Sequence, residues 1–169
     1  MVSAQARSDA QAEPRAAAAW RRLAEIEDPE IPALSIVELG IVRFVEERAD
    51  GVLEVGLSPT YTGCPATEHI GRLVREALES AGASPFRITQ VLKPAWSSDW
   101  ISPEGRRKLA EYGIVPPPRG AAAMRAAPVV CARCGSSRTE CVSQFGSTPC
   151  KALHRCLECL EPFECFKCI

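Results

Sequence analysis

The pattern of hydrophobic and polar positions predicts three helices in the first two thirds of the chain. The first begins near Arg15, and Trp20, Leu23 and Ala24 fall on one of its faces. It must end before the Asp28-Pro29 pair, because proline disfavours a helical conformation in the residue that precedes it. An amphipathic helix is therefore expected to open the folded part of the chain.

Two further helices follow it. The apolar positions of the second recur at helical spacing and are Ile70, Leu73, Val74, Ala77, Leu78 and Ala81. Pro65 suits its first position, and Gly82 is expected to end it. Ser102 is expected to cap the third helix, with Pro103 in its first turn and Gly113 at its end.

Three segments have the pattern of β-strands. Residues 41–47 are rich in β-branched and aromatic side chains, and apolar and polar positions alternate over residues 53–57. The Asp50-Gly51 pair between them is typical of a hairpin turn. Residues 86–92 form the third predicted strand. The order helix, strand, strand, helix, strand, helix predicts a small α+β domain.

Composition divides the chain into four parts. Residues 1–14 are small and polar and are expected to be a disordered lead-in. The α+β domain is expected over 15–117, a linker over 118–127 and a cysteine-rich unit over 128–169. The chain begins without the basic and apolar leader of a secreted protein and contains no long apolar run. We therefore expect a cytoplasmic protein with no membrane segment.

Eight of the nine cysteines lie in the last 39 residues and include three CxxC pairs, Cys131/Cys134, Cys156/Cys159 and Cys165/Cys168. Two residues between thiolates let both sulfurs bind one tetrahedral ion. The first two pairs are separated by 21 residues, which is room for a hairpin. In a reducing compartment such cysteines bind metal more often than one another. The tail is predicted to be a small all-β zinc ribbon that needs its metal to fold, with a disulfide-stapled module as the alternative.

A second metal site in the same tail is an open alternative. The first two pairs leave over Cys141, Cys150, Cys165 and Cys168. These four would supply a second set of thiolate ligands. Two metal ions per chain, rather than one, would support that arrangement.

Net charge and motifs weigh against several classes of function. The chain has 20 basic and 21 acidic residues and a net charge of −1, which gives little electrostatic attraction to nucleic acid. It contains no phosphate-binding glycine loop, no HExxH motif and no GxSxG motif. Nucleotide hydrolysis, metalloprotease and serine hydrolase activities therefore lack motif support. No motif in the sequence indicates an enzyme class.

Cys64 is the one cysteine outside the tail, in the loop between the second strand and the second helix. With Pro65 in the first helical position, Cys64 is expected at the N-cap, where the helix dipole and free N–H groups favour the thiolate. It is a candidate nucleophile or metal ligand, with an inert packed thiol as the alternative. His69, five residues on, is more typical of a surface histidine than of a catalytic partner. An earlier turn carries the carboxylates of Asp28 and Glu30, for which helix termination is the alternative role.

Four pieces of the sequence together resemble the PaaD-type D components of the phenylacetyl-CoA epoxidase system of bacterial phenylacetate breakdown. They are DPEIP at 28–32, TGCP at 62–65, DWISPEG at 99–105 and FGSTPCKAL at 145–153. The resemblance extends from about Arg15 to Ile169. Its first part is similar to the small α+β domain of iron-sulfur assembly factors, and its last part is similar to the ribbon of the D-type proteins.

The resemblance implies an accessory protein that assembles or repairs the iron-sulfur cluster of the epoxidase reductase component without catalysing the epoxidation. The matching residues are Cys64, Thr62, Asp28 and Glu30 for cluster handling, and Cys131, Cys134, Cys156 and Cys159 for zinc. Zinc is the implied resident metal, and a transient iron ion or iron-sulfur cluster is implied at Cys64. The implied partners are the reductase subunit or the cluster-assembly machinery, and a homodimer stays open. The alternatives are a zinc-ribbon module for protein or nucleic-acid interaction and a thiol enzyme that uses Cys64.

Overall fold

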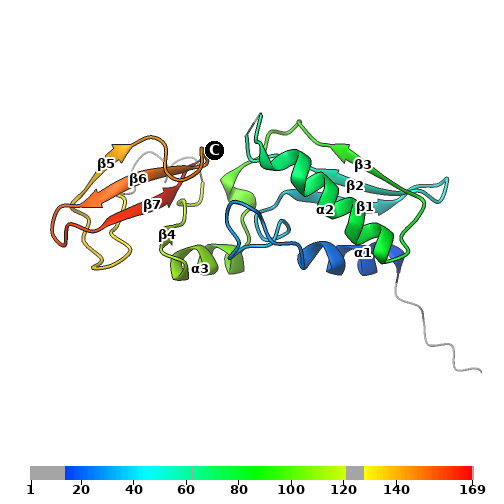
Figure 1. Cartoon of the computed structure of the whole chain (residues 1–169), viewed down its shortest axis with the longest axis horizontal. Coiled ribbons are helices and arrows are strands. Elements are labelled where there is room, and N and C mark those ends of the chain that lie inside the picture. The colour runs from blue at the N-terminus through cyan, green and yellow to red at the C-terminus, as the bar shows by residue number, and fades with distance from the viewer. Residues whose placement is uncertain (1–13, 62, 121–127, 169) are drawn as a thin grey trace, which may run out of the picture.

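The computed structural model describes residues 14–61, 63–120 and 128–168, which form two lobes along one long axis (Figure 1). The first lobe contains helices α1 (Arg15–Ala24), α2 (Ala66–Ser80) and α3 (Pro103–Glu111) and strands β1 (Val42–Glu47), β2 (Leu53–Leu57) and β3 (Phe86–Gln90). A short 3-10 helix, η1 (Ser98–Trp100), precedes α3. The second lobe contains strands β4 (Ile114–Val115), β5 (Thr139–Ser143), β6 (Lys151–Cys156) and β7 (Pro162–Phe166). The predicted α+β fold followed by a small all-β unit is confirmed.

Some of the predicted segments fall outside these ranges. Residues 1–13 of the predicted lead-in, residues 121–127 of the predicted linker over 118–127, and Thr62 all lie outside the described residues. Of the helices that the structure describes, none is long and apolar enough to cross a bilayer.

The first lobe is built on a three-stranded sheet in the order β1-β2-β3. β1 and β2 pair antiparallel across the predicted turn, where Gly51 has a φ of 77°, a conformation that glycine adopts without strain. β2 and β3 pair parallel, and α2 makes the crossover between them. α1 contacts both β1 and α2, so the two helices pack beside each other against the sheet.

The buried face of α1 differs from the predicted one. Its buried residues are Ala19 and Leu23, whereas Trp20 is 36% exposed and Ala24 is also exposed. Leu23 is buried as predicted, but Trp20 and Ala24 were wrongly placed on the buried face, where Ala19, four residues before Leu23, lies instead. The cap of α3 is as predicted, since the Ser102 side chain accepts the backbone N–H at the third helical position.

The second lobe is a four-stranded sheet in the order β4-β7-β6-β5. β5 pairs antiparallel with β6, and β6 pairs antiparallel with β7, as a ribbon requires. β4 pairs parallel with β7 although it follows α3 directly in the chain. The boundaries 15–117 and 128–169 stay a prediction. The two predicted units nevertheless share this sheet, because β4 lies in the first and β7 in the second.

Side chains of the second lobe are buried in the core of the first. Cys150 and Phe166 are each 3% exposed and pack with residues of the α+β domain in one buried cluster. The ring centroids of Phe166 and Trp96 lie 5.9 Å apart, and the Trp96 indole N–H donates to the Leu39 carbonyl at 3.0 Å. The ribbon is thus fixed against the α+β domain, beside the loop that carries Cys64.

Candidate functional site

Cys64 lies in the loop between the end of β2 and the start of α2, and its side chain is half-buried. Its N–H donates to the Tyr61 carbonyl at 3.3 Å, and its carbonyl accepts the Thr67 N–H at 3.1 Å. This tight turn delays the regular helix, so α2 begins at Ala66 with Pro65 as its N-cap. The predicted N-cap position of Cys64 was therefore wrong by one residue, although the thiol does lie at the start of α2.

The acidic turn is held by its own backbone. The Asp28 carboxylate accepts the N–H groups of Glu30 at 3.0 Å and Ile31 at 2.8 Å. Asp28 is 6% exposed, and burial raises the pKa of its carboxyl group although the two N–H groups oppose that shift. Burial, and then the neighbouring Asp28 charge, raise the pKa of Glu30. The two carboxyl groups are thus less acidic than exposed ones, and a bound cation would relieve their repulsion.

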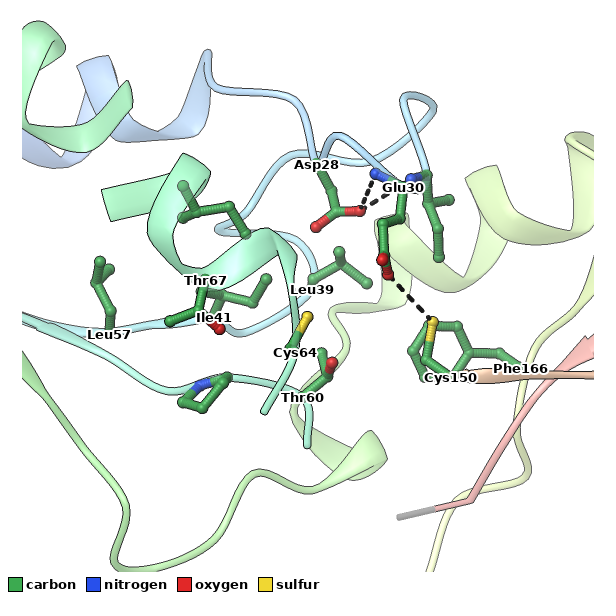
Figure 2. Close-up of a pocket in the computed structure, with 13 residues that line it drawn as sticks. Asp28, Glu30, Leu39, Ile41, Leu57, Thr60, Cys64, Thr67, Cys150 and Phe166 are labelled. Carbon is green, nitrogen blue, oxygen red and sulfur yellow. Dashed lines mark hydrogen bonds between the residues drawn. The ribbon is translucent and has the colours of Figure 1, made fainter. Parts of the chain in front are cut away.

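A cavity of about 30 Å³ lies between this turn, the Cys64 loop and the ribbon. Its lining is mostly apolar, with Asp28, Glu30, Cys64 and Cys150 as its ionisable groups. Figure 2 shows the Cys64 sulfur, the Glu30 carboxylate and the Cys150 sulfur around the same space. A volume of this size admits one or two waters or a single ion. The structure therefore brings together three of the predicted residues, Cys64, Asp28 and Glu30.

Cys150 is the member of this site that sequence reasoning missed. It directly precedes β6, and its thiol donates to the Glu30 carboxylate with Sγ 3.9 Å from Oε2. The Thr148 hydroxyl lies 3.0 Å from the same sulfur, and burial raises the pKa of the Cys150 thiol. The FGSTPCKAL piece at 145–153 was a signal, because it lies outside the CxxC pairs. Nothing in its spacing, however, points to a contact with a residue 120 positions away.

Tyr61 adds a phenol beside Cys64. Its hydroxyl is buried and has no hydrogen-bond partner within the part of the chain that the structure describes. Burial, and then the nearby Cys64 thiol, raise the pKa of Tyr61, so the phenol stays neutral. It can therefore donate a hydrogen bond to a group that enters the site.

The four predicted ribbon ligands come together at the far end of β6 from Cys150. The sulfurs of Cys131, Cys134, Cys156 and Cys159 all lie within 4.8 Å of one another. The Sγ–Sγ distances are 3.7 Å for Cys131 and Cys159 and 3.6 Å for Cys134 and Cys156. A tetrahedron with Zn–S bonds of about 2.3 Å places its sulfurs about 3.8 Å apart.

Backbone groups also prepare this site for metal. The N–H groups of Cys159 and Glu158 lie 3.5 and 3.4 Å from the Cys156 sulfur and lower the pKa of Cys156 to about 6. A thiol with that pKa is largely thiolate at neutral pH, which is the form that binds zinc. The donor set therefore fits one tetrahedral zinc ion.

The other four tail cysteines do not come together. Among the described residues, the ribbon set is the one group of three or more potential ligands that converges within 4.8 Å. Cys150 faces the interface cavity, Cys165 is buried on β7, and Cys141 and Cys168 are exposed. The predicted second site at Cys141, Cys150, Cys165 and Cys168 thus has no convergent geometry, because strand pairing and docking of the ribbon separate these residues.

Comparisons with known proteins match both lobes. Residues 16–85 match the family described as iron-sulfur cluster assembly protein, and residues 116–167 match the PaaD zinc beta ribbon domain. A protein of Escherichia coli (strain K12) named as the D component of 1,2-phenylacetyl-CoA epoxidase is 48% identical over 151 residues, 89% of this chain and 91% of that protein. The Fe-S protein maturation auxiliary factor of Porphyromonas gingivalis (strain ATCC BAA-308 / W83) is 34% identical over 90 residues, 53% of this chain and 85% of that protein.

The first lobe also has a solved counterpart. A domain of unknown function, DUF59, from Bacillus anthracis aligns with a TM-score of 0.52 and 24% identity over 56% of this chain and 91% of that one. At this identity the likeness concerns the fold alone. The match to the Escherichia coli protein covers nearly all of both chains. The chain belongs to the family of PaaD-type D components of phenylacetyl-CoA epoxidase, with an iron-sulfur assembly domain followed by a zinc β-ribbon.

Proposed function

We propose that this protein is a cytoplasmic accessory factor that assembles or repairs the iron-sulfur cluster in the reductase component of a phenylacetyl-CoA epoxidase. Its family membership and the match of residues 16–85 to iron-sulfur assembly proteins support the accessory role. The maturation factor that is similar to its first half supports the same role. The reductase subunit or the cluster-assembly machinery is the partner, and the chain itself does not catalyse the epoxidation.

One observation carries this proposal: the Cys64 thiol and the carboxylates of Asp28 and Glu30 line a single small cavity. Thiolate and carboxylate groups are both good ligands for iron. A cavity whose lining is mostly apolar limits the access of water to a bound ion. The first lobe therefore has the groups needed to hold iron while it passes to another protein.

Zinc has a separate, structural role in the ribbon. Cys131, Cys134, Cys156 and Cys159 supply four thiolates, which leaves no open coordination position for catalysis. Of the ribbon residues, Cys131, Cys156, Phe163 and Cys165 make a separate small buried cluster. So small a core cannot stabilise the ribbon by itself, and metal binding supplies the remaining folding free energy.

The alternative functions have weaker support. A Cys64 thiol enzyme requires an oriented base, but His69 is exposed and its Nδ1 lies 2.9 Å from Arg72 Nη2 on the surface of α2. A nucleic-acid module requires excess positive charge, whereas the net charge is −1.

The test is Cys64→Ser in cells that grow on phenylacetate as sole carbon source. We expect the variant chain to keep its fold and zinc content, while the reductase loses cluster occupancy and the cells stop growing on phenylacetate. Cys141→Ser is the matched control, because Cys141 is exposed on β5 and lines neither site. Normal cluster occupancy in Cys64→Ser cells would refute the proposal.

A further inference from the structure

The interface cavity contains one more metal-binding group than the assembly domain can provide. The domain contributes Cys64, Glu30 and Asp28, of which Asp28 already accepts two backbone N–H groups, and the ribbon contributes Cys150. Cys150 is 3% exposed, and its thiol contacts the Glu30 carboxylate 3.9 Å away. The ribbon thus holds a thiol directly against a carboxylate of the other domain. A cysteine that only packed in the core would not need this contact.

We propose that Cys64, Cys150 and Glu30 form a composite site for one ferrous ion across the interface between the assembly domain and the ribbon. The proposal rests on the function proposed above and names where the iron is held. Two sulfurs and a carboxylate form a ligand set of mixed softness that binds ferrous iron.

The cavity favours a single ion over a preformed cluster. Its volume of about 30 Å³ is close to that of one or two waters, which is too little for two iron and two sulfide ions without opening of the interface. The ligand atoms of Cys64, Cys150 and Glu30 also do not converge as the ribbon thiols do. Among the described residues, only the ribbon set has three or more ligand atoms that all lie within 4.8 Å of one another. Side chains must therefore rotate onto the ion, which makes binding weaker and release faster than at the ribbon.

Binding of ferrous iron exchanges thiol protons for the metal ion. Ferrous ion enters as a dication, and each thiol that binds as a thiolate releases one proton to solvent. Cys150 donates to the Glu30 carboxylate, so its proton is present until the ion displaces it. No electron is transferred in this step, so it needs no oxidant or reductant.

The test is an oxygen-free titration of the full-length, zinc-loaded chain with Co²⁺, a spectroscopic probe of ferrous sites, followed by ferrous iron. We expect one additional metal per chain, with thiolate-to-cobalt charge-transfer absorption and no loss of zinc. Cys64→Ser and Cys150→Ser should each weaken binding by at least about tenfold and reduce the charge-transfer band. Glu30→Gln should weaken binding with the band retained, and Cys141→Ser should bind as the unchanged chain does.

A second measurement tests the proposal even if the Cys150→Ser variant fails to fold. In the unchanged chain, bound cobalt should slow alkylation of Cys64 and Cys150, measured by mass spectrometry, and leave Cys141 unaffected. Wild-type affinity and spectrum in a folded Cys150→Ser variant would overturn the proposal, as would alkylation of Cys150 that cobalt does not slow. A Cys64–Cys150 disulfide, with no cobalt binding in the reduced chain, would also overturn it.

Growth separates this inference from the proposed function. If Cys64→Ser abolishes growth on phenylacetate and Cys150→Ser neither binds metal differently nor affects growth, the accessory function stands and the composite site fails. If Cys64→Ser cells grow normally while cobalt binding depends on both cysteines, the composite site stands as a metal site and the accessory function fails.

Discussion

Phe166 offers the most direct way to test whether the ribbon and the assembly domain are held together by buried contacts. It is the last residue of β7, it is 3% exposed, and its ring packs 5.9 Å from that of Trp96. Phe166→Ala removes this ring from a cluster of buried residues that otherwise belongs almost entirely to the first lobe. The zinc ligands lie at the opposite end of the ribbon, so zinc binding should be unaffected.

The expected loss is large for a chain of this size. Truncation of a buried phenylalanine to alanine costs about 3–5 kcal/mol, and the lost aromatic pair is part of that sum. The total stability of a small domain is about 5–15 kcal/mol. We therefore expect a population in which the ribbon keeps its zinc but no longer packs on the assembly domain.

Urea unfolding of the zinc-loaded chain, followed by tryptophan fluorescence, measures this loss. Trp96 is 4% exposed beside Phe166, so undocking should shift its emission to longer wavelength before global unfolding. The matched control is Phe145→Ala, because Phe145 is 65% exposed and its main interaction is with Lys167 Nζ, 4.3 Å from the ring centroid. That contact is worth at most about 1 kcal/mol at an exposed site.

The comparison between the two alanine variants decides the question. If Phe166→Ala costs no more than Phe145→Ala and leaves Trp96 emission unchanged, the docking of the ribbon contributes nothing to stability. The composite site at the interface would then lose its structural basis, because Cys150 would not be held beside Glu30.

Three other predictions concern single positions. Cys156→Ser, at a fully buried zinc ligand, should abolish zinc binding and expose the tail to protease while the first lobe stays folded; full zinc occupancy by elemental analysis would contradict it. Burial raises the pKa of Asp28 above its ordinary value of 3.8, so ionisation of Asp28 lowers the stability of the fold as the pH rises through the folded-state pKa. Asp28→Asn should therefore be more stable than the unchanged chain at pH 7. Thermal unfolding should show this difference disappearing towards pH 3. At Gly40, with a φ of 71°, a Cβ would lie 2.8 Å from both Cβ and O of Trp100, so Gly40→Ala should lower the free energy of unfolding in urea by about 2 kcal/mol or more. Gly51→Ala, at a φ of 77° with no atom near the added Cβ, should lower it by about 1 kcal/mol. Equal losses in the two variants would contradict the steric explanation.

Local sequence signals were sufficient to predict most elements of the fold. Periodicity located α2 and the strand pair β1 and β2, and the Ser-Pro pair located the start of α3. These signals succeed because they describe interactions between residues close in the chain, such as a cap or a hairpin turn. The face of α1 was wrong because helical spacing alone cannot decide whether Ala19 or Trp20 is buried. That choice depends on how closely a neighbouring element approaches.

The candidate site was predictable only in part, for the same reason. Cys64 was identified from its place before a helix, and the two carboxylates were identified from the resemblance and from their turn. Cys150 was assigned to a different metal site, because cysteine spacing groups residues by distance along the chain. Its contact with Glu30 depends on docking of the ribbon through Phe166 and on the pairing of β4 with β7. No local pattern contains either interaction.

Strand β6 connects the two metal-binding regions of the molecule. Cys156, a proposed zinc ligand, is its last residue, and Cys150 immediately precedes its first. If zinc folds the ribbon as proposed, the hydrogen bonds between β6 and β7 fix the position of Cys150 relative to Phe166. Phe166 and the pairing of β4 with β7 together hold the ribbon on the assembly domain. Occupancy of the proposed zinc site would then favour the arrangement of Cys150 and Glu30 at the cavity. By thermodynamic linkage, iron bound at the interface would in turn stabilise the docked, zinc-bound ribbon. In the proposed composite site, the folded ribbon thus supplies the Cys150 thiol, a ligand that the assembly domain lacks.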